Sequence, residues 1–343
     1  MKYAVCALFT LFFLSVHAFS QTSGDSAAPS APEIDRTPKF DGSIKTKLET
    51  SVEAGVVRFN VRNSRVGLRG DVSPYLSYRL QVEFSNEGTF SPLDMFGTIK
   101  PFQNFSLLFG QQLVQFDNVY IITPAEMMFA NRAFVGKYFT PGTRDLGAVA
   151  QYKFSVGDFP MEGQAGVFNG GRINDPQWTD NPSYSMRLIA GSMNGFRTTA
   201  KIYKYNSELR DLFFWGADVH YARDRLCLQA ELMNRHSNDT GLDLLGAYVQ
   251  GSYTLGLPNS KMFHSLTPAA RWDAMGYDVW NTSFDVKRIT AGVSFGLSHI
   301  NNSTLRVNYE HYFTPKYLHF PDFDNRDPHV ADNKVTVELV VRF

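Results

Sequence analysis

Apolar and polar residues alternate along most of this chain, and this period of two constrains the fold more than any other feature. In residues 303–313, for example, Leu305 and Val307 are apolar, whereas Arg306 between them is charged. Successive side chains of a β-strand point to opposite faces, so this pattern predicts strands with one apolar and one polar face. No segment shows a convincing helical periodicity. The sequence therefore predicts an all-β fold.

About sixteen such segments, each of about ten residues, follow one another along the chain, which is the length and even number expected of a transmembrane β-barrel. Their connections alternate between short ones, such as 73–75 and 223–224, and long ones, such as 114–143 and 314–333. Short turns at one end and long loops at the other are typical of outer-membrane barrels. The predicted strands are residues 42–50, 61–72, 76–85, 92–100, 104–113, 144–154, 160–168, 183–192, 196–205, 212–222, 225–235, 243–254, 265–273, 287–298, 303–313 and 334–343.

A secreted β-sandwich or jelly roll is the alternative fold, because its strands also alternate. The outer faces of a sandwich are wet and its inner faces form one core, which gives no reason for charged residues on one face of nearly every strand. A barrel closed around water explains them, with apolar side chains toward lipid and charged ones toward the lumen. We therefore expect a transmembrane antiparallel β-barrel of about 16 strands. The terminal Phe343 fits this fold, because a final aromatic residue resembles the signal that the barrel-insertion machinery reads.

The N-terminus predicts export. Lys2 precedes an apolar run that begins near Ala4, and small residues follow this run, which is the layout of a secretory signal peptide. We assign residues 1–20 to the signal peptide, residues 21–39 to a flexible lead rich in Ser, Ala and Pro, and residues 40–343 to the barrel. The expected location is the outer membrane of a bacterial cell.

The composition argues against a nucleic-acid-binding protein, and its many aromatic residues need an explanation. The chain has 33 basic and 33 acidic residues, whereas a nucleic-acid-binding protein carries a basic excess. Its 29 Phe and 16 Tyr residues allow two interpretations, stacking platforms for sugars or girdles at the two membrane interfaces. Many of them lie near the ends of predicted strands, which favours girdles in contact with lipid. Examples are Tyr75, Phe84, Phe154, Phe313 and Phe343.

Motifs that carry chemistry in other proteins have a simpler interpretation here. The sequence GVSFG matches a hydrolase pattern, but Ser294 lies in mid-strand without the strand-to-helix turn that exposes such a nucleophile. Asp322, Asp324 and Asp327 lack the glycine and the distal glutamate of a calcium loop. The histidines show no zinc-binding spacing, and Cys227 is the single cysteine after signal cleavage. We therefore expect no enzyme activity, no metal and no cofactor.

Three stretches between about residues 60 and 155 resemble the phosphate-selective porin O and P family. RNSRVGLRGDV at 62–72 is similar to its early arginine-rich strand, and LDMFGTIKPFQNFSLLFGQQLVQF is similar to the strand pair before its third loop. FANRAFVGK, followed by TRDLGAVAQYKF, looks like the loop's Arg-bearing segment and the next strand. The resemblance implies a porin whose third loop folds into the lumen as a constriction. Gln111, Gln112 and Gln115 stand where the family tends to have basic groups, so no high-affinity phosphate site is expected.

The expected function is a passive diffusion channel for small hydrophilic solutes or inorganic anions, phosphate among them, with a weak anion preference. The alternative is a structural or adhesive outer-membrane barrel with a plugged lumen. Porins of this size often form trimers, so the resemblance implies a homotrimer, although no interface residue is identified. The residues expected at the constriction or along the pore are Asp117, Glu126, Arg132, Lys137 and Arg144 in or beside the third loop, and Arg65, Arg69, Arg79, Lys153, Arg271, Arg288 and Arg306 on the strands.

Overall fold

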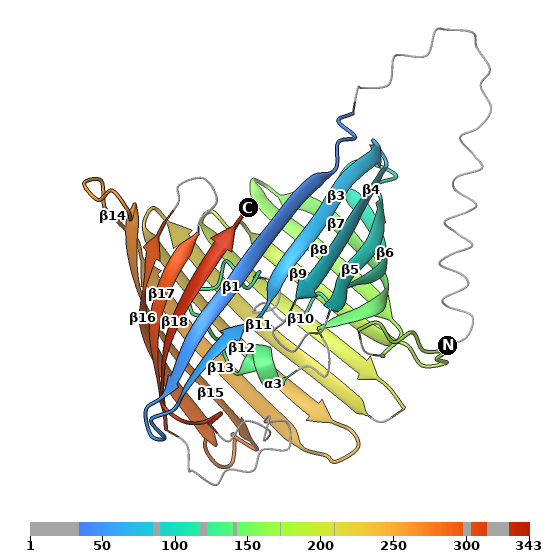
Figure 1. The fold of residues 1–343 in the computed structure, drawn as a ribbon. Helices are drawn as coiled ribbons and strands as arrows, with labels where there is room; N and C mark the ends of the chain where they lie inside the picture. The colour runs from blue at the N-terminus through green and yellow to red at the C-terminus, as the bar shows by residue number, and fades with distance from the viewer. Residues whose placement is uncertain are drawn as a thin grey trace, which may run out of the picture. The chain divides into compact units, whose positions relative to one another are not determined.

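The computed structural model describes residues 34–84, 90–116, 122–139, 143–171, 173–208, 210–297, 303–313 and 329–343. The compact unit Arg36–Phe343 is a closed antiparallel β-barrel (Figure 1). Its strands are β1 (Lys39–Ser51), β2 (Val57–Val61), β3 (Ser64–Ser73), β4 (Leu76–Phe84), β5 (Phe90–Ile99), β6 (Phe105–Leu113), β7 (Arg144–Val156), β8 (Phe159–Phe168), β9 (Ser183–Gly191), β10 (Phe196–Asn206), β11 (Asp211–Arg223), β12 (Leu226–Ser237), β13 (Asp243–Tyr253), β14 (Leu255–Gly256), β15 (Ser265–Tyr277), β16 (Val286–Gly296), β17 (Thr304–Tyr312) and β18 (Lys334–Arg342). One short helix, α3 (Val135–Tyr138), lies between β6 and β7.

The eighteen strand segments of the described chain make sixteen barrel strands. β2 and β3 both pair with β1, one with its second half and the other with its first half. They form a single barrel strand that is interrupted at Asn63, whose φ is 57°. β13 and β14 likewise both pair with β15. The barrel closes between β1 and β18 in a continuous register from Ser43↔Arg342 to Ser51↔Lys334. The prediction of a barrel of about 16 strands is confirmed, and each predicted strand range overlaps an observed one.

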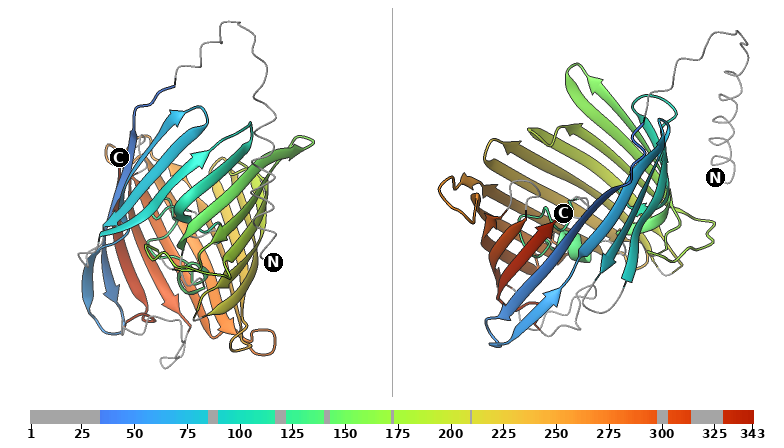
Figure 2. Two further views of the ribbon diagram at one scale, coloured as in Figure 1. Left: turned by 90° about the vertical axis from the view of Figure 1, so that its right-hand side faces the viewer. Right: turned by 45° about the horizontal axis from the view of Figure 1, so that its top comes forward.

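The connections also follow the predicted alternation. Two-residue turns join β3 to β4, β7 to β8 and β11 to β12, whereas long connections follow β6, β8 and β17 at the other end. Figure 2 shows the two ends from different sides. The predicted signal peptide and most of the lead, residues 1–33, lie outside the described residues, and β1 begins at Lys39. The described residues include no helix that is both long and apolar enough to cross a membrane.

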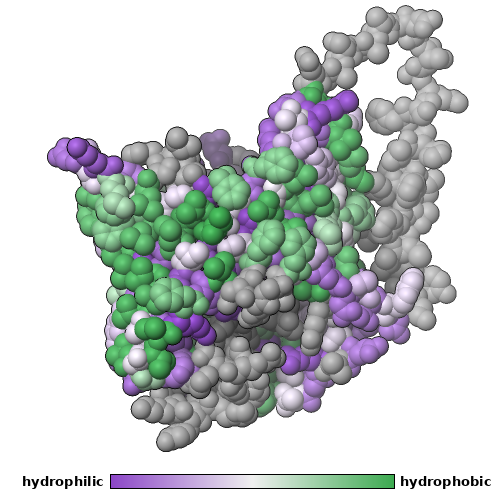
Figure 3. All heavy atoms as spheres, in the orientation of Figure 1, coloured by the Kyte–Doolittle hydropathy of each residue, from purple (hydrophilic) through white to green (hydrophobic). Residues whose placement is uncertain are grey.

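The outer face of the barrel is apolar. Side chains such as Phe59, Leu80 and Val249 are exposed there, and Figure 3 shows hydrophobic residues gathered over the outer face of the strands turned to the viewer. Four of the five aromatic residues expected at the membrane interfaces are strongly exposed and lie at strand ends, whereas Phe154 stacks beside Tyr152. Those four are Tyr75, Phe84, Phe313 and Phe343. This arrangement is the one expected of two aromatic girdles.

A hydrophobic core lies inside the barrel, near the end that carries the long connections. We use the name loop 3 for residues 114–143, and its described part supplies Phe116, Phe134, Val135 and Phe139 to this core. Side chains from β6–β8, β10–β13, β15 and β16 belong to the same core. Gly246 on β13 permits the close approach of α3, because a Cβ there would lie 2.6 Å from the Phe139 ring. Alternation alone suggested a wholly polar lumen, but part of the lumen is filled by this apolar core. The buried wall members include Phe168, Tyr203, Phe214, Met233 and Met275.

Candidate constriction of the barrel lumen

Loop 3 is held against the inner wall through its main chain. Long cationic side chains of the wall donate hydrogen bonds to successive carbonyl oxygens of the loop. These bonds satisfy buried carbonyl groups of the loop backbone, and they add to the packing of the loop's apolar side chains in the core. The five bonds run from Lys45 to Pro124 (3.2 Å), from Arg306 to Ala125 (2.7 Å), from Arg271 to Asn131 (3.0 Å), from Arg288 to Arg132 (2.7 Å) and from Arg235 to Phe139 (3.1 Å).

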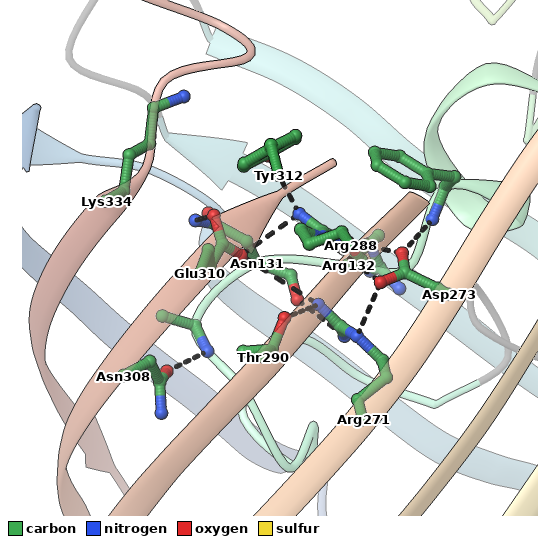
Figure 4. Close-up of polar contacts among 12 residues, drawn as sticks. Asn131, Arg132, Arg271, Asp273, Arg288, Thr290, Asn308, Glu310, Tyr312 and Lys334 are labelled. Carbon is green, nitrogen blue, oxygen red and sulfur yellow. Dashed lines mark hydrogen bonds and ion pairs between the residues drawn. The ribbon is translucent and has the colours of Figure 1, made fainter. Parts of the chain in front are cut away.

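The same wall makes further hydrogen bonds with the loop. The Phe134 N–H donates to Asp273 Oδ2 at 2.9 Å, and the Ala130 N–H donates to Asn308 Oδ1 at 2.8 Å. The side chain of Asn131 accepts a bond from Lys47 at 2.9 Å. Figure 4 shows Asp273 and Asn308, with Arg271 and Arg288, around the part of the loop that carries Asn131 and Arg132. The middle of loop 3 therefore lies inside the lumen, along β1 and β15–β18.

Ion pairs between adjacent strands fix the cationic side chains of this wall. Asp273 and Arg288 are direct cross-strand partners, and Arg288 bonds both Asp273 at 2.7 Å and Glu310 at 3.0 Å. Arg306 is the direct partner of Glu338 and bonds it at 2.9 Å. Opposite charges placed face to face across strands stabilise a sheet. Lys45, Arg271, Arg288 and Arg306 therefore each have an anionic neighbour, and their remaining donors hold loop 3.

This arrangement changes the interpretation of Arg271, Arg288 and Arg306. All three point inward, as the alternation predicted, but their side chains are only 3–4 % exposed. They cannot contact a passing solute while loop 3 covers them. Their role in this structure is to hold the loop, and we correct their assignment as pore-lining residues.

The remaining predicted residues on β3, β4 and β7 keep more contact with solvent. Arg65 bonds Glu83 at 2.7 Å, Arg79 bonds Asp41, and Arg69 lies 3.9 Å from Asp41 with a side chain that is 65 % exposed. Lys153 is exposed on the inward face of β7. These side chains line the part of the wall on which we find no anchor of loop 3.

The predicted residues in and beside loop 3 have different positions. Glu126 bonds Arg342 at 3.1 Å, and Arg144 is buried in an ion pair of 2.7 Å with Asp94. Arg132 is half-buried beside a cavity of about 30 Å³, room for about one water. Asp117 lies outside the described residues, and Lys137 belongs to α3, where its side chain is likewise not described.

Gln111 differs from the expectation drawn from the family resemblance. It pairs with Met95 and Leu146, whose side chains point outward, so it does not face the lumen. Its amide donates to the carbonyls of Pro92 and Leu93, both at 2.9 Å. Gln111 is therefore a structural residue at the outer rim of the barrel and does not replace a basic group of the pore.

A second cluster of charged side chains on the inner wall was missed by the sequence analysis. Arg187, Arg197 and Lys201 on β9 and β10 surround Asp218 on β11, and Lys201 also contacts Glu231 on β12. We call these five residues the β9–β12 cluster. Alternation correctly assigns each of them to a polar face, but it does not indicate which residues of different strands lie at the same height.

Among the described residues, no group of three or more His, Cys, Asp or Glu side chains could hold a metal ion. The acidic stretch with Asp322, Asp324 and Asp327 lies outside these residues. Ser294 lies within β16 and faces Thr267 and Arg306 across the sheet, so the expected mid-strand position is confirmed.

The geometry can be compared with known proteins. No protein-family model matches the sequence, and no curated protein sequence matches it. Salmonella typhi OmpF aligns with 89 % of this chain and 97 % of its own, at 13 % identity and a TM-score of 0.62. The anion-selective porin of Comamonas acidovorans aligns with 89 % of this chain and 98 % of its own, at 13 % identity and a TM-score of 0.60. The outer membrane channel DcaP of Acinetobacter baumannii aligns with 91 % and 100 %, at 13 % identity and a TM-score of 0.59.

These likenesses define the class of fold. The chain forms the closed sixteen-stranded barrel that is found in porins. At such low identity the likeness concerns the fold alone, and it does not show phosphate selectivity.

Proposed function

We propose that this protein is a porin of the bacterial outer membrane, a passive diffusion channel for small hydrophilic solutes with a weak preference for anions. One observation carries the proposal. Arginines recur along a single barrel strand, β2 with β3, from the long-loop end to the other end, and Arg79 on β4 continues the row. We call this row the arginine wall. Its other members are Arg58 on β2, Arg62 between β2 and β3, and Arg65 and Arg69 on β3.

The charge balance of the arginine wall supports a weak preference. Three of its arginines have a carboxylate within hydrogen-bonding distance, because Arg58 bonds Glu49, Arg65 bonds Glu83 and Arg79 bonds Asp41, whereas Arg69 has only a long ion pair of 3.9 Å with Asp41. Arg62 and Arg69 are exposed, and their charges are the least compensated. Charges at a narrow part of a lumen set ion preference. Two weakly compensated cations support anion preference without a high-affinity phosphate site.

We place the solute path between loop 3 and the arginine wall. The anchors of loop 3 lie on β1, β12 and β15–β18, and its apolar residues share a core with β6–β8, β10–β13, β15 and β16, which leaves β2–β4 as the open side. The same proposal includes export through a signal peptide in residues 1–20, contact with outer-membrane lipids, and recognition of Phe343 by the barrel-insertion machinery. It also includes a homotrimer.

Conductance measurements test this function. Refolded protein in a planar bilayer should give stepwise, ohmic conductance, and its reversal potential in a salt gradient should indicate weak anion selectivity. Arg69→Glu should move the reversal potential toward cation selectivity, because it replaces an exposed positive charge with a negative one. Arg132→Glu should shift it in the same direction if the Arg132 side chain borders the path. A cation-selective wild type, or an Arg69→Glu variant with an unchanged reversal potential, would contradict the proposed path.

The hydrophobic core inside the lumen favours one second candidate, a structural or adhesive barrel whose lumen is plugged. Phe116, Phe134 and Phe139 are almost fully buried against the wall, and such packing resists solute passage. A barrel that remains silent in the bilayer, yet shows the heat-modifiable gel mobility of a folded barrel, would establish this second function and exclude the channel.

A further inference from the structure

The β9–β12 cluster contains a buried guanidinium whose donors are not all used. The side chain of Arg187 is only 2 % exposed, and its nearest described carboxylate oxygen, Asp218 Oδ2, lies 4.0 Å from Nη2. This distance is too long for a hydrogen bond. Among the described residues, neither Nε nor Nη2 of Arg187 has a hydrogen-bond partner. Leaving a buried charged donor unsatisfied is costly, so these two nitrogens require an acceptor.

The acids of the cluster are already engaged by other cations. Asp218 accepts bonds from Arg197 at 2.8 Å and from Lys201 at 3.3 Å. Glu231 contacts Lys201. Three cationic side chains therefore share two carboxylates, all of them buried. On the adjacent strand β8, Glu162 accepts a bond of 2.6 Å from the amide of Gln164, and it is the nearest further acid to the cluster on that strand.

A further unused donor lies on the same inner face. Thr199 pairs directly with Asp218 and is two residues from Lys201, which is the cross-strand partner of Arg187. Its side chain is buried, and its hydroxyl lacks a hydrogen-bond partner within the described chain. The hydroxyl can donate to the same acceptor that Arg187 requires. A water could accept these bonds, whereas an anion would also interact with the three cations that share Asp218 and Glu231.

We propose that the β9–β12 cluster binds one small inorganic anion of chloride size, with Arg187 and Thr199 as its principal donors. The site deepens the proposed function, because a bound anion on the inner wall gives permeating anions an intermediate position in the lumen. Its existence does not require conductance, since binding and permeation are separate measurements.

Thermal unfolding of the full chain in detergent micelles tests the site directly. Chloride is raised at constant ionic strength, with gluconate as the balancing anion that is too large for the site. A ligand that binds only the folded state stabilises it, so the wild-type Tm should rise by about 2–4 °C as chloride saturates the site. Arg187→Gln should abolish this rise. Thr199→Val, which keeps the shape and charge of the cluster, should reduce it.

Two controls decide between a bound chloride and an acceptor for Arg187 within the protein. Arg223→Gln removes an exposed arginine of β11 and should keep the full chloride effect. Equal Tm values in chloride and gluconate would overturn the proposal. The proposal would also be overturned if the Tm did not depend on chloride and if Gln164→Leu and Arg187→Gln lowered the Tm equally. Gln164 Oε1, which has no hydrogen-bond partner within the described chain, would then be the acceptor of Arg187. A barrel that does not conduct but has a chloride-dependent Tm would refute the channel and support the anion site. A barrel that conducts but has a chloride-independent Tm would support the channel and refute the anion site.

Discussion

At the scale of single residues, Arg288 joins the wall and loop 3. It bonds two acids, Asp273 and Glu310, and donates to the carbonyl of Arg132. Removing one member of a buried ion pair leaves the remaining charges uncompensated, which costs about 3–5 kcal/mol. We expect Arg288→Ala to lower the free energy of unfolding by this order.

Urea titration of the folded barrel, followed by gel mobility, measures the effect of Arg288→Ala. Arg69→Ala is the matched control, because its exposed ion pair of 3.9 Å should contribute less than about 1 kcal/mol. In bilayers, current noise should increase for the Arg288 variant if conductance is present, since loop 3 loses an anchor. Equal unfolding curves for the two variants would show that the buried network does not stabilise the barrel.

Cys227 tests the register of the inner wall at a second residue. It pairs with Ala222 and Ser252 and lies on the same face as Gln229 and Glu231, so it faces the lumen. Small charged thiol reagents should therefore label it in the refolded protein. In a Cys227→Ser background, Leu228→Cys should react only with membrane-soluble maleimides, because its side chain points outward. Labelling of both positions by the charged reagent would contradict the assigned faces.

At the scale of elements, the strands could be predicted because alternation is a local signal. Each predicted strand is present, including 61–72, which the structure divides at Asn63. The candidate site was less predictable, because it depends on register and on loop 3. Alternation identified Arg288 as inward but could not reveal that the loop covers it. It also could not place Arg187 beside Lys201, since the stagger of two strands is set by the closed barrel and not by either sequence.

The bases of two connections at the long-loop end are linked by Asp332. Its carboxylate accepts a bond of 2.6 Å from Ser51, at the end of β1, and contacts His329 at 2.8 Å. Burial of Asp332 opposes ionisation, but the hydrogen bonds from Ser51 and His329 outweigh it and hold its pKa below the usual value. A lowered pKa in the folded state means that the carboxylate stabilises the link above the unfolded pKa of about 3.9.

This link should therefore weaken as the pH falls below about 4. Amide hydrogen exchange at residues 51–56, corrected for the intrinsic effect of pH, should show protection near neutral pH and its loss in acid. Asp332→Asn should have low protection at both pH values, because the amide no longer provides the charged acceptor. Identical protection in the wild type and Asp332→Asn near neutral pH would show that the carboxylate does not link the two connections.

At the scale of the whole molecule, the barrel depends on closure between its first and last strands. Gly42 and Phe343 exchange backbone hydrogen bonds of 2.9 and 3.1 Å at one end of this seam. The Phe343 ring lies over Gly42, since a Cβ at that glycine would be 2.5 Å from the ring. A cross-strand aromatic ring that covers a glycine is a known device for stabilising β-sheets. The C-terminal aromatic residue therefore has a structural role in addition to its proposed recognition during insertion.

A double-mutant cycle separates these two roles of Phe343. Gly42→Ala should displace the ring, and Phe343→Ala should remove it, so each should lower the free energy of unfolding, while the double variant should lose less than the sum. We expect a coupling of about 1 kcal/mol, within the range for residues in contact. The folded fraction in urea, read from heat-modifiable gel mobility, measures all four proteins, and Val335→Ala near the other end of β18 should be additive with Gly42→Ala. Additive effects of Gly42→Ala and Phe343→Ala, combined with poor insertion of Phe343→Ala in cells, would assign the terminal residue to recognition alone.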